Sequence, residues 1–217
     1  MPGAAAVVIW CDVEFGIKDE FDDWHAHEHM PERLSIPGFL RASRWVSGDG
    51  RNGYFMLYEA QDEATVTAGP YLQRLNDPTP WSRKMMPHHR NMVRSLCRVH
   101  VSFGAGLGHA LLTARFAPEP GQAEPLERWL SAELLPSLPS RKGIVAAQLL
   151  RRIGQPAGSP TTEQQLRGGD ASADWIVLVH GYSADALASV GLRNAVARSY
   201  GLACLMTAAD VRGGIAP

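Results

Sequence analysis

The sequence predicts an α+β fold: a tandem duplication of a ferredoxin-like β-α-β-β-α-β unit, whose two antiparallel sheets pack as one intrachain α/β barrel. Three observations support this prediction. A short motif recurs at a constant spacing of 105 residues, strand-like apolar runs frame each copy, and a glycine-rich segment separates the copies. The recurring positions form three pairs: Trp24 with Trp129, Glu28 with Glu133, and Pro31 with Pro136.

The first copy reads as a strand, a helix, two strands, a helical region of two segments and a last strand. A helix is expected from about residue 18 to Pro31, because acidic residues crowd its first turns, where the helix dipole favours negative charge. Apolar runs rich in β-branched and aromatic residues predict strands at 6–13, 39–46, 54–59 and 92–103. Helical segments are predicted at 62–75 and 80–86.

The second copy repeats this order. Its predicted strands are 110–116, 144–151, 175–180 and 202–211, with a second helix at 184–200. The connection 154–173 is rich in Gly, Pro, Ser, Thr and Gln, so we expect a mobile loop that adds nothing to a core. Residues 104–108 are expected to be a flexible linker between a histidine-bearing unit, 1–103, and a degenerate one, 109–217.

A four-stranded sheet with helices on one face leaves its other face bare. Burying that face against a second copy removes it from water, and the duplication indicates that one chain supplies both sheets. The alternative is two independently folded units on a flexible joint. A homodimer of the two-repeat chain is compatible with either arrangement.

Composition and charge argue against several classes of protein. The 217 residues carry a net charge of −1, and no basic stripe interleaved with aromatics favours nucleic acid. Apolar runs fall far short of the roughly 20 residues of a membrane span, and no basic segment of a secretory signal opens the chain. Three widely spaced cysteines in apolar segments indicate buried thiols in a reducing compartment. We therefore expect a cytoplasmic protein whose partner is a small molecule.

Comparing the two copies shows which helix positions face inward. Where the first copy has His25 and His29, the second has Leu130 and Leu134. Burying unpaired ionisable groups is costly, so two inward histidines beside Glu28 need partners or a use. A His–Glu group can act as general acid or base, since histidine titrates near neutral pH.

A structural interpretation stands beside the catalytic one. Glu28 recurs as Glu133 in a copy without histidines, so its carboxylate could simply accept hydrogen bonds near the helix. His25 and His29 could be satisfied boundary residues. Their i, i+4 spacing also occurs in helical zinc pairs, but a third ligand would have to come from Glu28, His88 or His89. We predict no bound metal.

The run from Trp24 to Leu40, WHAHEHMPERLSIPGFL, resembles the dimeric α/β-barrel superfamily, especially its bacterial EthD-like members. Those proteins often carry W-x-x-x-E-H-x-P, or H-x-P, and then P-G-F. The segments 70–72 and 79–83 resemble a later part of the same proteins, so the resemblance covers most of residues 5–103. In the second half it survives only at Trp129, Glu133, Pro136 and Gly143.

The resemblance implies a pocket between sheet and helices in each half. Members of the superfamily include cofactor-independent monooxygenases of polyketide-type aromatics, muconolactone-type isomerases, haem-degrading enzymes and accessory proteins of xenobiotic catabolism. The motif histidine falls on His29, and Leu134 replaces it in the second half, so only the first half is expected to be active. We expect no cofactor, with haem as the alternative.

These inferences favour an enzyme that acts on a hydrophobic or aromatic small molecule by proton transfer, cofactor-independent oxygenation or isomerisation. The residues expected to act are His29, His25 and Glu28 in catalysis, and Trp24, Trp10, His27, Arg33 and Arg44 in substrate binding, either arginine stabilising a developing anion. A non-catalytic ligand-binding or accessory protein, or a subunit that recruits another protein, are the alternatives.

Overall fold

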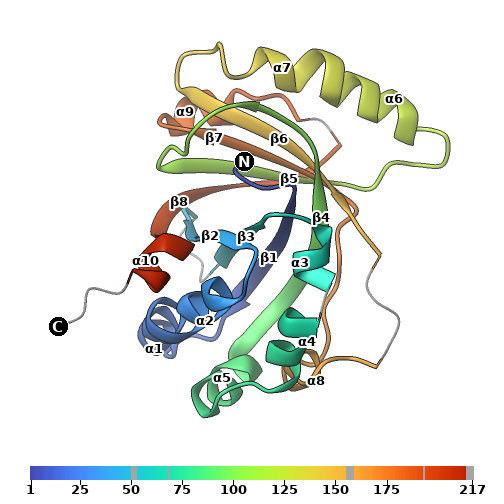
Figure 1. Cartoon of the computed structure of the whole chain (residues 1–217). Coiled ribbons are helices and arrows are strands. Elements are labelled where there is room, and N and C mark those ends of the chain that lie inside the picture. Colours follow the sequence, from blue (N-terminus) through green and yellow to red (C-terminus); the bar gives the residue numbers. More distant parts are fainter. Residues whose placement is uncertain (50–52, 68, 155–158, 193, 214–217) are drawn as a thin grey trace.

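The computed structural model describes residues 1–49, 53–67, 69–154, 159–192 and 194–213. Eight antiparallel strands close into a barrel in the order β1-β3-β2-β8-β5-β7-β6-β4 (Figure 1). Their bounds are β1 Ala5–Val13, β2 Phe39–Ser47, β3 Gly53–Ala60, β4 His89–Gly104, β5 Ala110–Phe116, β6 Ile144–Arg152, β7 Trp175–Gly181 and β8 Val196–Thr207. The predicted α+β barrel of two antiparallel sheets is confirmed.

Two long strands join the sheets. β4 pairs with β1 through residues 89–98 and with β6 through 97–104. β8 pairs with β5 through 196–201 and with β2 through 200–207. The halves therefore share a continuous hydrogen-bonded wall, and the alternative of two independent units is wrong.

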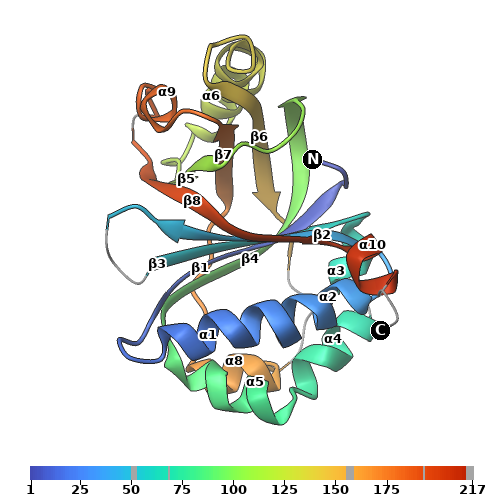
Figure 2. The ribbon, with the colours of Figure 1, turned by 90° about the vertical axis from the view of Figure 1, so that its left-hand side faces the viewer.

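Helices cover the outer face of each sheet, as Figure 2 shows. In the first half these are α1 Lys18–Trp24, a π-helical turn η1 His25–His29, α2 Met30–Ser35, α3 Glu63–Thr67, α4 Gly69–Asn76, α5 Pro80–Met85 and a 3-10 turn Met86–His88. The first helix does not end at Pro31, as predicted, but runs on to Ser35. A proline ring normally clashes with the carbonyl four residues earlier, and the wider π turn before Pro31 relieves that clash.

The second half has a counterpart of the first helix and its π turn, but its other helices differ from those of the first half. It contains α6 Ala123–Arg128, η3 Trp129–Leu134 and α7 Leu135–Ser137. The predicted helix 184–200 is much shorter, α9 Ala184–Ala188, because residues from Val196 on pair with β5 as part of β8. β8 also ends earlier than predicted: Thr207 caps α10, Ala208–Arg212, instead of continuing the strand.

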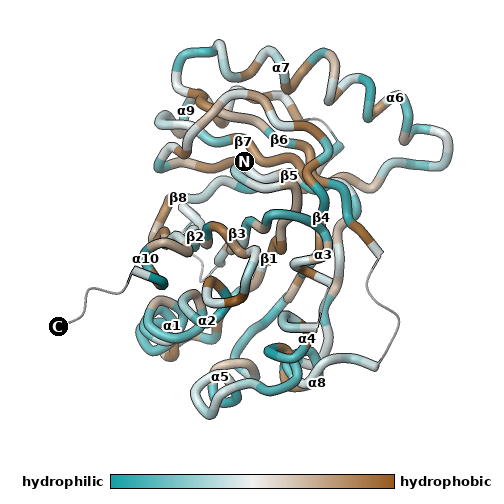
Figure 3. The backbone as a smooth tube through the Cα atoms, viewed as in Figure 1, coloured by the Kyte–Doolittle hydropathy of each residue, from teal (hydrophilic) through white to brown (hydrophobic). Residues whose placement is uncertain are grey.

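Alternate residues of the strands build separate cores. In β1, Val7 and Ile9 pack toward the helices, whereas Val8 and Trp10 face the barrel interior with residues of both halves. Figure 3 shows apolar residues along the strands of both sheets. Because successive side chains of a strand point to opposite faces, each sheet separates a helix-side core from the barrel interior.

The connection 154–173 differs from its prediction. Residues 155–158 lie outside the described residues, but Thr161 and Gln164 form a capping box that starts helix α8, Thr162–Arg167. The side chains of Glu163 and Arg167 are buried against the first half. Ala171 forms a short parallel bridge with Val93 of β4. The described part of this segment therefore contributes buried side chains, and the prediction of a loop that adds nothing to a core is wrong.

The glycine-rich connection packs closely as well. Gly104 has φ +75° and ends β4, and a side chain at Gly108 would meet the Gly181 carbonyl oxygen at 1.8 Å. These glycines allow close backbone approach. Cys11 and Cys97 are buried and all three cysteines are free thiols. Among the described residues, no helix is long and apolar enough to span a membrane.

Candidate functional site

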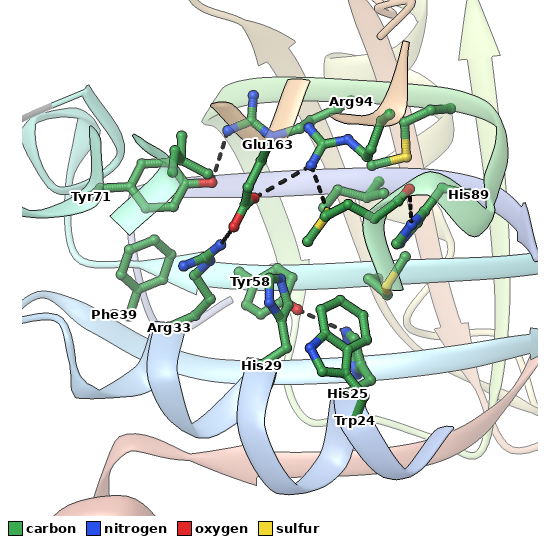
Figure 4. A pocket seen from close by; sticks show the side chains of 16 residues that line it. Trp24, His25, His29, Arg33, Phe39, Tyr58, Tyr71, His89, Arg94 and Glu163 are labelled. Carbon is green, nitrogen blue, oxygen red and sulfur yellow. Dashed lines mark hydrogen bonds and ion pairs between the residues drawn. The ribbon is translucent and has the colours of Figure 1, made fainter. Parts of the chain in front are cut away.

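The first helix and the sheet enclose a cavity lined by histidines (Figure 4). Trp24, His25 and His29 reach it from the helix, Tyr58 from β3 and His89 from the start of β4. Only about 20 Å³ is open to the centre of a water molecule, room for about one or two waters. The site is thus narrow, and both apolar and charged side chains line it.

Aromatic contacts fix the two helical histidines. The His25 Nε2 atom lies 2.8 Å from the Tyr58 hydroxyl. The His29 ring packs on Trp24, with ring centroids 4.5 Å apart, and lies 5.7 Å from the His25 ring. The Nδ1 atoms of both histidines are buried without a hydrogen-bond partner among the described residues. Each therefore presents a polar atom that a bound molecule could satisfy.

Burial keeps these histidines uncharged. Burial, and then the charge of Arg33, lowers the pKa of His29 well below its usual range. Burial, and then Arg44, does the same to the pKa of His25. Burial followed by the charge of Arg167 lowers the pKa of His89 to about 4. At neutral pH these rings are therefore free imidazoles, each with one nitrogen lone pair.

Charged groups from both repeats close one end of the cavity. Arg33, on α2, forms a buried ion pair with Glu163 of α8, and both side chains are 3% exposed. Arg167 of α8 pairs with Glu163 and with Asp170. On the sheet side, the Arg94 Nη2 atom donates to the Tyr71 hydroxyl at 2.8 Å. The second repeat, which has no histidine at the matching helix positions, thus supplies a wall of the first repeat's site.

Glu28 lies outside this cavity, contrary to its predicted role beside the histidines. Its Oε1 atom accepts hydrogen bonds from Trp24 Nε1 at 3.2 Å, Thr79 Oγ1 at 2.5 Å and Ser82 Oγ at 3.2 Å. Thr79 and Ser82 are the N-cap and first turn of α5. The carboxylate therefore ties the first helix to α5. Glu133, its counterpart, is exposed, and its side chain has no hydrogen bond among the described residues.

Replacing Glu28 with alanine is expected to lower the free energy of unfolding by about 1–3 kcal/mol, because partly buried donors lose their acceptor. Urea denaturation measures this. The matched variant Glu133→Ala, at the exposed repeat position, should stay within about 0.5 kcal/mol of the parent. Equal losses in both variants would contradict a bracing role specific to Glu28.

Three other predicted binding residues also lie elsewhere. Trp10 faces the barrel interior, where its Nε1 atom donates to Thr113 Oγ1 at 3.1 Å, so the sheet separates it from the histidines. His27 is exposed on the outer helix face. The Arg44 Nη1 atom donates to the Asp22 carbonyl at 2.8 Å and braces α1 against β2. Of the eight predicted site residues, the cavity contains Trp24, His25, His29 and Arg33.

Sequence reasoning missed several groups of the cavity. Tyr58 shares the helix-side alternation of β3 with Tyr54 and Met56, a pattern that could have indicated it. His89 was considered only as a metal ligand. Glu163 had no signal at all, because it lies 130 residues from Arg33 within a polar segment.

The cavity does not offer a ready site for zinc or haem. Among the described residues, no group of three or more His, Cys, Asp or Glu side chains lies close enough to hold a metal ion. His25 Nε2 already contacts Tyr58, and Glu28 points elsewhere. Haem, like any other molecule larger than one or two waters, enters a space of about 20 Å³ only if the cavity opens. No step is therefore assigned to either group.

A scan of protein-family models and a search of curated proteins gave no match. Among solved structures, the chain is similar to an anthrone oxidase-like protein at 11% identity, covering 94% of this chain and 93% of that one with a TM-score of 0.63. It is also similar to a candidate monooxygenase from Fusobacterium nucleatum (7% identity, 95% and 96% covered, TM-score 0.58). A candidate chlorite dismutase matches over the full length of both chains (12% identity, TM-score 0.53). At these identities the likeness shows a shared ferredoxin-like barrel fold.

Proposed function

We propose that this chain is a small-molecule oxygenase-type enzyme that needs no cofactor and works as an EthD-like barrel with one active half. The observation that carries the proposal is the pair of buried, uncharged histidines, with Nδ1 atoms unpartnered among the described residues, in the cavity between the first helix and the sheet. The names of two neighbours, an anthrone oxidase-like protein and a candidate monooxygenase, support the choice of reaction. The substrate class is an aromatic compound with an activated C–H bond.

In this proposal His29 accepts a proton from that C–H bond. The carbanion passes its electrons to O₂, so that a CH₂ group and O₂ together give a C=O group and water. Trp24 holds the His29 ring in place, and Tyr58 does the same for His25. An anionic oxygen of the substrate can compete with Glu163 for Arg33, which would stabilise the developing charge.

The size of the cavity sets a condition on this chemistry. An aromatic substrate enters only when groups at the cavity's charged end move apart, because the present space holds one or two waters. The contact between Arg33 and Glu163 joins the two repeats at that end. Substrate binding is therefore coupled to α8 in this proposal.

The test is oxygen uptake with anthrone as the probe substrate. His29→Ala is expected to lower the rate by about 10²–10⁴-fold, the usual contribution of a positioned base. The matched control His27→Ala, two residues away on the exposed face, should keep the parent's rate. Circular dichroism confirms that both variants are folded.

Other outcomes of this experiment would contradict the proposed base or favour a different function. A fully active His29→Ala protein would contradict the proposed base. If the parent exchanges the activated hydrogen for deuterium without consuming O₂, the reaction is an isomerisation-type proton transfer. Tight binding of anthrone with neither exchange nor oxygen uptake would favour the non-catalytic accessory function.

A further inference from the structure

A second cavity lies at one end of the barrel, on the opposite side of the first sheet from His29. It is lined by Arg41 of β2, Gln148 of β6, His180 of β7 and the connection 104–107. About 270 Å³ is open to the centre of a water molecule, against about 20 Å³ at the histidine cavity. This space is large enough for a small organic molecule, which reaches Gln148 Oε1 and His180 Nδ1 when the side chains that cover these two atoms shift.

Two buried polar atoms at this cavity lack partners. Gln148 and His180 are each 1% exposed, and neither Gln148 Oε1 nor His180 Nδ1 has a hydrogen bond among the described residues. The Gln148 amide nitrogen makes only a long contact, 3.5 Å, to Ser102 Oγ. An unsatisfied buried polar atom costs about 1–3 kcal/mol, so a pair of them in one cavity calls for a bound partner.

The register of the strands places these two residues together. Gln148 is opposite Leu178 and Ala146 is opposite His180, so Gln148 and His180 are diagonal neighbours on adjacent strands. They share the inward face of Leu150, Ile176 and Leu178. The His180 ring also lies 5.7 Å from the fully buried ring of Trp45.

Two cations line the cavity: Arg41, and the α-amino group of Met1, which donates to Ser102 Oγ at 3.1 Å. The Arg41 Nη2 atom donates to Glu59 Oε1 at 2.9 Å, and its Nε atom donates to the other carboxylate oxygen. Within the described part of the chain, Arg41 Nη1 has no hydrogen bond. Burial, with the charge of Arg41 second, lowers the pKa of His180 to about 3, so its ring is neutral. A neutral His180 ring can accept a hydrogen bond at Nδ1.

We propose that this barrel-end cavity binds a small molecule through a primary carboxamide. The amide nitrogen has two hydrogens, one for Gln148 Oε1 and one for His180 Nδ1, and the amide oxygen accepts from Arg41 Nη1. A carboxylate of the same shape lacks both donors. An apolar molecule of the same size would leave all three protein atoms unpaired.

Nuclear magnetic resonance of the uniformly ¹⁵N-labelled full chain, titrated with benzamide, tests the proposal. Trp45 Nε1 donates to Ser43 Oγ at 2.9 Å, so its indole resonance reports on the neighbourhood of His180. We expect saturable shifts of the Trp45 indole and the Gln148 side-chain amide. Benzoate and toluene at equal concentration should give neither.

Two variants make the assignment specific. Gln148→Met and His180→Leu are each expected to weaken benzamide binding at least tenfold while the spectrum stays dispersed. If one variant fails to fold, the other and the two control probes still decide. His29→Ala should bind benzamide like the parent, because His29 lies in the other cavity.

Three results would overturn the proposal. The first is the absence of saturable shifts in the folded parent, which would mean that water alone fills the site. The second is equal binding of benzamide and toluene. The third is shifts confined to the Trp24 indole, which would place the molecule in the histidine cavity.

Discussion

Replacing Glu163 with alanine is expected to lower the free energy of unfolding by about 3–5 kcal/mol, the usual loss when one partner of a buried ion pair is removed. Arg33 is 3% exposed and Glu163 is its buried partner from the second repeat. Its remaining carboxylate contact is the adjacent Glu32. The buried charge of Arg33 would then have one carboxylate partner, Glu32, instead of two. Urea denaturation of the full chain measures the change.

The matched controls separate charge from packing. Glu119→Ala, at an exposed position of the same repeat, should change stability by no more than about 0.5 kcal/mol. The double variant Arg33→Met with Glu163→Met removes both charges and is expected to recover most of the loss, because apolar pairs often replace buried ion pairs without penalty. A Glu163→Ala protein as stable as the parent would mean that the pair does not hold α8.

Mild acid is expected to destabilise the protein steeply. His25, His29, His89 and His180 are buried, and burial lowers the pKa of each. In the unfolded chain a histidine binds a proton near pH 6.5. The folded state resists that proton down to about pH 4 at His89 and about pH 3 at His180. Stability is therefore complete above pH 6.5 and falls as the pH drops below it.

Linkage sets the size of this effect at about 1.4 kcal/mol per pH unit for each such histidine. Four of them give a limiting slope of about 5–6 kcal/mol per pH unit on the acid side of pH 6. Urea midpoints at pH 7.5, 6.0 and 5.0 measure the slope before carboxylates protonate. His180→Leu should reduce it by about a quarter. A stability that is flat between pH 7 and 5 would show that the buried rings take up protons readily.

The sequence predicted the architecture because the two copies of the motif could be compared position by position. Matching π turns begin at His25, directly after Trp24, and at Trp129, and His25 is buried as is its counterpart Leu130. Comparing the two copies does not predict an element that only one half of the chain contains. The second repeat has only the five residues of α9 where a long helix was expected, and it has α8 where a loop was expected.

The candidate site was predicted in part for the same reason. The inward-facing positions of the first helix identify Trp24, His25 and His29, because the face of a single helix can be predicted from local sequence spacing alone. Glu28 was assigned to the wrong neighbours because its partners, Thr79 and Ser82, come from another helix. Trp10 was misplaced because alternation separates the two faces of a strand without saying which face holds a cavity.

The contribution of α8 has a consequence for how such a molecule can specialise. In a symmetric assembly of identical subunits, any substitution appears twice, so a helix that blocks one cavity would block both. Here a single polypeptide holds both modules, and each can change alone. The half that contains α8 can therefore contribute Glu163 to the cavity of the other half without a matching change in its own cavity. A single chain in this way allows the two halves of the barrel to differ in sequence and in contacts.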